Sequence, residues 1–172
     1  MEQKNKYNIR PLWLYTILIC IIIDQLSKIL IQINLIPYST TNIISDILRF
    51  SYTENPGIAF GLNPFNNPIV LLLVSILAIY FIFKVLVDSS NNSSLTQFGL
   101  SLIIGGALGN FIDRFFSAFQ IMGYQGVIDF IDVGINNHIR FPYVFNLADS
   151  FITIGISLYF ISFIKIKFFN DK

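Results

Sequence analysis

The sequence GVIDFIDV at residues 126–133, followed by PYVFNLADSF at residues 142–151, is the part of the chain around which the rest is interpreted. Each segment carries a carboxylate, Asp129 or Asp149, in an otherwise apolar run. Ionising a carboxylate in apolar surroundings is costly unless another group compensates the charge. These aspartates are therefore either capping and loop residues beside a membrane helix or residues that perform chemistry, and the other polar residues of the chain bear on that choice.

The composition is that of a membrane protein. Of the 172 residues, 54% are hydrophobic and only 12% are charged, which is too apolar for a soluble domain of this size. A net charge of +1, without a basic surface interleaved with aromatic residues, argues against nucleic acid as a partner. The chain has one cysteine, Cys20, and one histidine, His138, so neither a disulfide framework nor a zinc site is expected.

Four apolar segments are long enough to cross about 30 Å of hydrocarbon at about 1.5 Å per residue. We therefore expect residues 1–172 to form a single, mainly α-helical integral membrane domain built as a four-helix transmembrane bundle. In the first loop, RFSYTEN and GIAFGL flank the turn-forming Asn55-Pro56-Gly57, which indicates short strands. The expected spans are about 11–36, 68–87, 95–116 and 144–166, and the two longer loops are about 34–67 and 117–143.

The positive charges predict the orientation of the spans. Each terminal tail carries three Lys or Arg residues, and Lys84 lies near the short Ser/Asn linker between the second and third spans. The two longer loops offer only Arg49 and Arg140 as clear loop cations. Because cytoplasmic segments carry an excess of Lys and Arg, we expect both termini in the cytoplasm and both longer loops outside.

With that orientation, the polar residues of the spans converge on the outer leaflet. A charge near mid-membrane costs about 2.5–3.5 kcal/mol, so clustering these residues allows them to pair around a water-filled pocket. Several are three or four residues apart and share a helix face. They are Asp24 and Lys28 in the first span, Asn110, Asp113 and Arg114 in the third, and Asn146 and Asp149 in the first turns of the fourth.

These pairs also have purely structural interpretations. Asp24 and Lys28 form an internal ion pair in the simplest view, and Asn110 with Arg114 serves as a polar contact between helices. The small residues Gly105, Gly106, Ala107 and Gly109 predict close helix packing.

The residue types favour acid chemistry over serine hydrolysis. Although serines are available, His138 lies in a loop without a nucleophile motif. Two facing aspartates share one proton, and such a pair activates water and protonates a scissile carbonyl without a metal or cofactor. On this chemistry alone Asp113 and Asp132 compete with Asp129 and Asp149, and spacing does not decide which two meet.

Five blocks of the sequence, in order from the first span to the fourth, resemble the motifs of the bacterial lipoprotein signal peptidases, also called signal peptidase II. The last three blocks together are highly specific. The blocks are DQLSK at 24–28, NPGIAFG at 55–61, GGALGNFIDR at 105–114, VIDFIDV at 127–133 and FNLADSFITIG at 145–155.

The resemblance implies a four-span aspartyl endopeptidase of the bacterial inner membrane, with its active site near the outer face and a small extracytoplasmic β-sheet cradle on the membrane surface. It would remove signal peptides from prolipoproteins just before a diacylglyceryl-modified cysteine. Its implied partners are these substrates, membrane lipid and cyclic-peptide antibiotics of the globomycin kind, which occupy the same pocket. The implied catalytic pair is Asp129 and Asp149. Residues that support the pair or bind substrate are Asp24, Lys28, Asn55, Gly57, Asn110, Arg114 and Asn146.

Two other classes of function are a small transporter or channel and a non-catalytic membrane assembly protein. A small transporter or channel would need symmetry-related broken helices or a polar path through the full thickness, and the second span and the inner halves of the others show no such path. A non-catalytic membrane assembly protein would use the same buried charges for stability alone.

Overall fold

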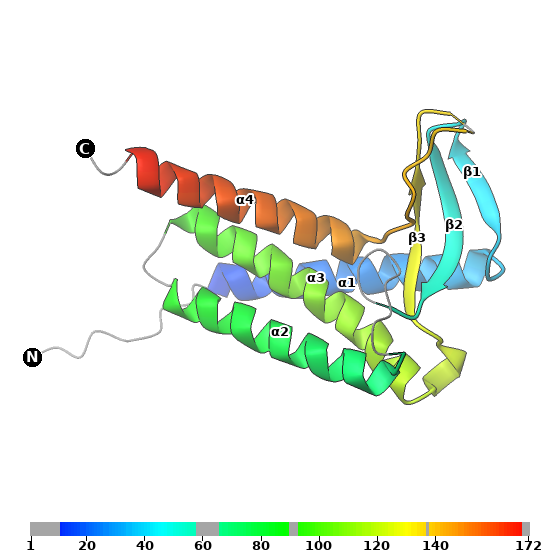
Figure 1. Ribbon diagram of the computed structural model, residues 1–172, viewed down its shortest axis with the longest axis horizontal. Coiled ribbons are helices and arrows are strands. Elements are labelled where there is room, and N and C mark those ends of the chain that lie inside the picture. Colours follow the sequence, from blue (N-terminus) through cyan, green and yellow to red (C-terminus); the bar gives the residue numbers. More distant parts are fainter. Residues whose placement is uncertain (1–10, 58–65, 90–92, 137, 170–172) are drawn as a thin grey trace, which may run out of the picture.

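The structure is a computed structural model, and it describes residues 11–57, 66–89, 93–136 and 138–169. In these residues it contains four long helices, a short 3₁₀ helix and a three-stranded sheet that stands at one end of the helix bundle (Figure 1). The helices are α1 (Pro11–Asn34), α2 (Pro68–Asp88), α3 (Ser94–Ala118) and α4 (Leu147–Phe169). All four are long and apolar enough to cross a membrane, which confirms the predicted multi-pass, mainly helical fold.

Local sequence signals define where the helices begin. Asn67 caps α2 by accepting hydrogen bonds from Ile69 N and Val70 N, and Pro68 occupies the first helical position, where its missing N–H costs nothing. Ser93 caps α3 in the same way through Thr96 N. The fourth helix begins at Leu147 and not near Val144, because residue 145 is still paired with a strand.

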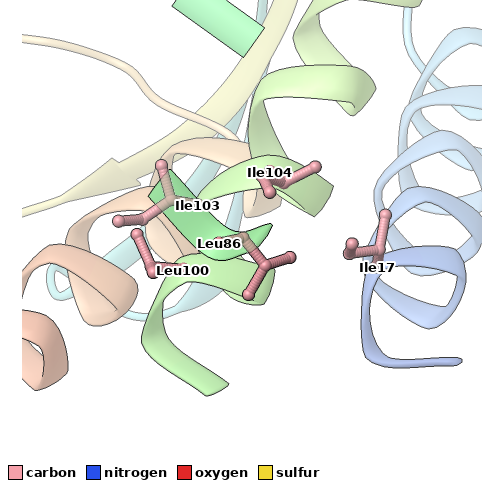
Figure 2. Packing of buried hydrophobic residues seen from close by; sticks show 5 residues of the cluster. All are labelled: Ile17, Leu86, Leu100, Ile103 and Ile104. Carbon is pink, nitrogen blue, oxygen red and sulfur yellow. The ribbon is translucent and has the colours of Figure 1, made fainter. Parts of the chain in front are cut away.

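The helix α3 is the centre of the bundle and packs against α1, α2 and α4. In its most apolar window 61% of the residues are buried, against 28% or less in the other helices, whose outer faces are therefore left for lipid. Figure 2 shows a core cluster of the bundle, in which Ile17 of α1 and Leu86 of α2 lie near Leu100, Ile103 and Ile104 of α3.

Small residues allow this close packing, as the sequence predicted. A Cβ atom on Gly105 would lie against Cys20 and Ile17 of α1, and one on Gly106 would collide with the Ala148 carbonyl of α4. Further along the same interface, Gly99 and Gly155 face each other across α3 and α4. The two backbones approach as closely as they do only because these side chains are missing.

The sheet is antiparallel, in the order β1-β2-β3. Its strands are β1 (Thr40–Ile44), β2 (Leu48–Asn55) and β3 (Val127–Val133). The expected strand RFSYTEN is β2, whereas residues 58–62 of GIAFGL lie outside the described residues. The strand β3 lies within the second loop, after the 3₁₀ helix η2 (Ile121–Gly123). The sequence pattern did not indicate a strand there.

Two of the contacts between the sheet and the helices are an apolar cluster and a backbone pairing. Ile128 and Phe130 of β3 pack with Tyr52 of β2 against Ile31 near the end of α1. Phe145, just before α4, accepts hydrogen bonds from the backbone N–H groups of Phe130 and Ile131. The second contact brings the start of α4 beside β3, and this is where the polar residues gather.

The close α3–α4 contact gives a stability prediction. A Cβ on Gly155 would lie 2.5 Å from the Gly99 carbonyl oxygen and 2.7 Å from Ile103 Cγ1. Although alanine favours helix, we expect Gly155→Ala to lower the free energy of unfolding by about 1–3 kcal/mol, because overpacking outweighs propensity. Thermal unfolding in detergent measures the change. Ser157→Ala, on the exposed face of the same helix, is the matched control and is expected to change little. An unchanged or higher midpoint for Gly155→Ala would contradict the packing described here.

Candidate active site

The N-terminus of α4 holds Asp149 in a reciprocal pair of hydrogen bonds. Asn146 is the residue before the helix, and its side-chain oxygen accepts from Asp149 N at 2.9 Å. In return, Asp149 Oδ2 accepts from Asn146 N at 3.2 Å. This is a capping box, which satisfies free N–H groups at a helix start and fixes the carboxylate there. The predicted position of Asn146 inside the fourth span is therefore wrong by one residue, and its cap role explains the spacing of three.

The same asparagine joins Asp149 to the strand β3. Asn146 is fully buried, and its Nδ2 donates to Asp129 Oδ1 at 2.6 Å and to the Ile128 carbonyl at 3.2 Å. One side chain therefore contacts both aspartates, which come from different elements 20 residues apart. Asp129 is buried, whereas Asp149 is partly open.

Asn110 of α3 completes the link on the other side. Its Nδ2 donates to Asp149 Oδ1 at 2.8 Å, and its Oδ1 accepts from Asn146 Nδ2 at 3.0 Å. The second aspartate has its own amide partner, because Asn55 at the end of β2 donates to Asp129 Oδ2 at 3.2 Å. Asn55 Oδ1 in turn accepts from Gly57 N at 2.9 Å, which holds the turn that follows the strand. Each carboxylate is thus held by amide donors on two sides.

Behind the layer formed by the two aspartates and their asparagine partners lies a buried group of three charged side chains. Lys28 Nζ is 2.8 Å from Asp24 Oδ2 and 2.7 Å from Asp113 Oδ2, and it donates to Asn110 Oδ1 at 3.0 Å. All three side chains are 0–1% exposed. The predicted Asp24–Lys28 pair is present, but Asp113 is its third member. The lysine uses all three of its N–H groups.

Arg114 lines a small pocket beside the aspartates, together with Asn55, Gly57, Ser117 and Gly126. Its Nε is buried and has no hydrogen-bond partner among the residues that the structure describes. Of the two residues interpreted as a polar contact between helices, Asn110 does link α3 to Lys28 of α1 and to Asp149 of α4. A planar guanidinium beside two carboxylates adds positive charge to the site and leaves donors for a ligand.

The four aspartates that the sequence offered as candidate acids have different partners in the structure. Asp129 and Asp149 meet through Asn146, whereas Asp113 is bound to Lys28. Asp132 faces away from this group, since its carboxylate binds Arg140 Nε at 2.7 Å and accepts from Ser51. In the described parts of the chain, no three His, Cys, Asp or Glu side chains form a group that would hold a metal ion.

The surroundings of Asp129 favour its protonated form. Burial and, to a smaller extent, the negative charge of Asp149 raise the pKa of Asp129 to about 7, although the hydrogen bonds from Asn55 and Asn146 act in the opposite direction. At Asp149, by contrast, two N–H donors and the positive end of the α4 dipole stabilise negative charge. The two carboxyls of the site therefore lie in different surroundings.

Sequence reasoning missed two parts of the site. Asp113 was placed among the converging polar residues and weighed as an alternative acid, but it was not identified as a partner of Lys28, although it lies three residues after Asn110 and so shares its face. Gln25 was not singled out at all, yet its Nε2 donates to the Gly109 carbonyl at 3.1 Å and to Asp113 Oδ1 at 3.2 Å. A polar residue next to Asp24 in an apolar span was the available signal.

Known proteins with the same pattern are membrane peptidases. The profile of the family Signal peptidase (SPase) II matches residues 16–165. The chain is 38% identical to the lipoprotein signal peptidase of Clostridioides difficile (strain 630) over 144 residues, which are 84% of this chain and 88% of that one. It is also 38% identical to the lipoprotein signal peptidase of Lactobacillus johnsonii over 159 residues, 92% and 95% of the two chains.

Solved structures agree with the sequence comparisons. A bacterial membrane enzyme structure determined by the in meso method at 2.3 Å resolution is similar with a TM-score of 0.78 and 27% identity, covering 96% of this chain and 94% of that one. A second such structure, at 1.9 Å resolution, has a TM-score of 0.70. The arrangement of helices and sheet is therefore that of a known type of membrane enzyme.

The interaction between the two aspartates is testable through the pKa of Asp129. In Asp149→Asn the repulsion disappears, so we expect this pKa to fall below about 7 while staying above its ordinary value, because burial remains. Infrared titration of the protonated carboxyl band in detergent or lipid measures the shift. Asp132→Asn removes a charge from the same strand beside Arg140, and it should leave the titration unchanged. An Asp129 pKa that is unaffected by Asp149→Asn would show that the two carboxyls are not coupled.

Proposed function

The chain belongs to the signal peptidase II family, the membrane proteases that cleave signal peptides from prolipoproteins, and from this premise we propose that Asp129 and Asp149 are its catalytic pair. The observation that carries the proposal is the double contact of Asn146, whose amide donates to Asp129 while its backbone N–H donates to Asp149. One residue therefore bonds to both carboxylates, whereas Asp24 and Asp113, the other two aspartates that share a partner, are bridged by the cation Lys28.

The chemistry follows from the protonation that each environment favours. Ionised Asp149 takes a proton from water as the water oxygen attacks the scissile carbonyl carbon, and neutral Asp129 gives its proton to the carbonyl oxygen. The tetrahedral intermediate then returns a proton to Asp129 as the C–N bond breaks, and the amine leaves with the proton that Asp149 had taken. Water is consumed, and the enzyme recovers its starting protonation.

The remaining polar residues have supporting roles in this proposal. Asn110 and Asn146 hold Asp149, Asn55 holds Asp129, and Gly57 keeps Asn55 in place through the turn. Arg114 has an unpartnered Nε beside the dyad and would bind carbonyl oxygens of the substrate backbone. Asp24 and Lys28 lie behind this layer.

We propose that the substrate is a diacylglyceryl-modified prolipoprotein, cleaved just before the lipidated cysteine. Its signal helix would lie between the spans with its acyl chains against apolar, lipid-facing side chains. Membrane lipid is therefore a partner, and inhibitors of the globomycin kind would occupy the same pocket. The whole of residues 1–172 would act as one membrane domain in the bacterial inner membrane.

The decisive test is cleavage of a purified, diacylglyceryl-modified precursor. We expect Asp129→Asn and Asp149→Asn each to abolish cleavage, since neither amide can transfer the required proton. Asp132→Asn is the matched control from the same strand and should keep activity close to that of the unchanged protein. Full activity in either dyad variant would remove the assignment.

The cleavage test requires that the two dyad variants remain folded, so that a loss of activity reports on chemistry. Because the pKa of Asp129 is raised to about 7 in the folded protein, its contribution to stability is fully present below the ordinary carboxyl pKa of about 4 and is lost as pH rises through about 7. An asparagine stays neutral, so Asp129→Asn should remain folded above this pH. If both variants were less stable than the unchanged protein, and the unchanged protein did not cleave the precursor either, the chain would be a non-catalytic assembly protein.

We further propose that both termini lie in the cytoplasm and that the sheet and dyad lie at the outer face. The Lys and Arg bias of the tails supports this orientation, as does the arrangement in which α1 begins and α4 ends at the side of the bundle away from the sheet (Figure 1). In a Cys20→Ser background, a membrane-impermeant maleimide added to intact spheroplasts should label Met122→Cys but not Asp88→Cys. Both positions are exposed in the fold. The reverse labelling pattern would invert the topology.

A further inference from the structure

We propose that Asp113 is a positioning residue which, with Asp24 and Lys28, sets the separation of the two dyad carboxylates. These three side chains are called the ion triad below. This inference rests on the proposed function of Asp129 and Asp149. It assigns Asp113 a task beyond neutralising a buried lysine.

The two acids of the ion triad bind backbone N–H groups at equivalent positions, one before each dyad aspartate. Asp113 Oδ2 accepts from Ile128 N at 3.2 Å, and Ile128 directly precedes Asp129. Asp24 Oδ1 accepts from Ala148 N at 2.9 Å, and Ala148 directly precedes Asp149. Each dyad aspartate therefore follows a residue whose N–H is bound by one acid of the triad.

Lys28 fixes the distance between these two anchor points. Its ammonium lies 2.8 Å from Asp24 and 2.7 Å from Asp113, in a site from which water is excluded. Coulomb attraction is much stronger there than in water, so the two acids are drawn to one centre. Strand β3 and the start of α4 are consequently held against a shared cation although they belong to different elements.

Asn110 connects Lys28 to the dyad itself. An asparagine amide has two orientations of similar shape, and its partners decide between them. Lys28 Nζ donates to Asn110 Oδ1 at 3.0 Å, which requires the Asn110 amide nitrogen to face Asp149 and to donate to it at 2.8 Å. In the opposite orientation the ammonium would face an N–H₂ group, and Asp149 would face an oxygen.

A role in charge balance alone does not require this geometry. Lys28 already has a partner in Asp24 at i,i+4, and one acid is enough to neutralise it. With Asp113 the ion triad carries a formal net charge of −1 in a buried site, which is costly. The extra acid is explained by the Ile128 N–H that it holds beside Asp129.

Asp113→Asn tests the inference in the full-length protein with the lipidated precursor. We expect kcat to fall by about 10- to 100-fold with KM within about threefold, because misplacing the dyad affects the chemical step more than binding. The alkaline limb of the pH profile should also move to lower pH, since wider separation weakens the effect of Asp149 on Asp129. Asp132→Asn is the control and should change neither quantity.

The double variant Asp113→Asn with Lys28→Met separates positioning from charge balance. It leaves Asp24 as the only charge and so keeps the net charge of −1, but it removes the bond from Lys28 to Asn110. We expect kcat to stay at least as low as in Asp113→Asn. Recovery of kcat in the double variant would overturn the inference, and so would an unchanged kcat and pH profile in a folded Asp113→Asn. Failure of both variants to fold would overturn it too, by assigning the ion triad to fold stability.

The parent and Asp129→Asn are measured in the same assay. If the parent cleaves the precursor and Asp129→Asn does not, the proposed function stands whatever Asp113→Asn does. If Asp129→Asn is active, the proposed function fails first.

Discussion

The fully buried amide of Asn146 is the contact on which the site depends. It is the point where β3, α3 and α4 meet, and it bonds to Asp129, to Asn110 and, through the capping box, to Asp149. An asparagine suits this position because it offers two donors and an acceptor without a charge of its own. Its hydrogen bonds are strong in this site because little water competes for them. The strand and the helix are joined at the place where Asp129 and Asp149, the proposed catalytic pair, lie.

The cost of burying charge explains how the polar residues are layered. Asp24, Lys28 and Asp113 are almost completely buried, where an unpaired charge would be very unfavourable, and each is bonded to the others or to backbone N–H groups. Asp149 is more open, and Arg114 lies beside it with an unpartnered Nε. The compensated charges thus lie behind the site, and Arg114 keeps an unpartnered donor beside the proposed dyad. The glycines of α3 allow this layering by bringing α1 and α4 close to it.

Much of the fold was predictable because lipid imposes simple rules. Apolar segments of membrane length gave the four helices, and the small residues around Gly106 gave the close packing of α3. The strand β3 was not predictable, since an apolar run with two aspartates does not distinguish a strand from a loop until its pairing with β2 is known. For the same reason spacing did not separate Asp129 from Asp132. The two differ by three positions in one strand, and tertiary contacts with Asn146 or Arg140 give them different surroundings.

The pH dependence of kcat/KM for the unchanged protein, acting on a lipidated precursor in detergent or lipid, tests most directly whether these two carboxyls work through one shared proton. The account predicts a bell-shaped profile whose alkaline limb falls near the Asp129 pKa of about 7, because the acid of the pair is lost there. A rate that stays level from about pH 5 to about pH 9 would contradict it, since no carboxyl proton would then be required for cleavage.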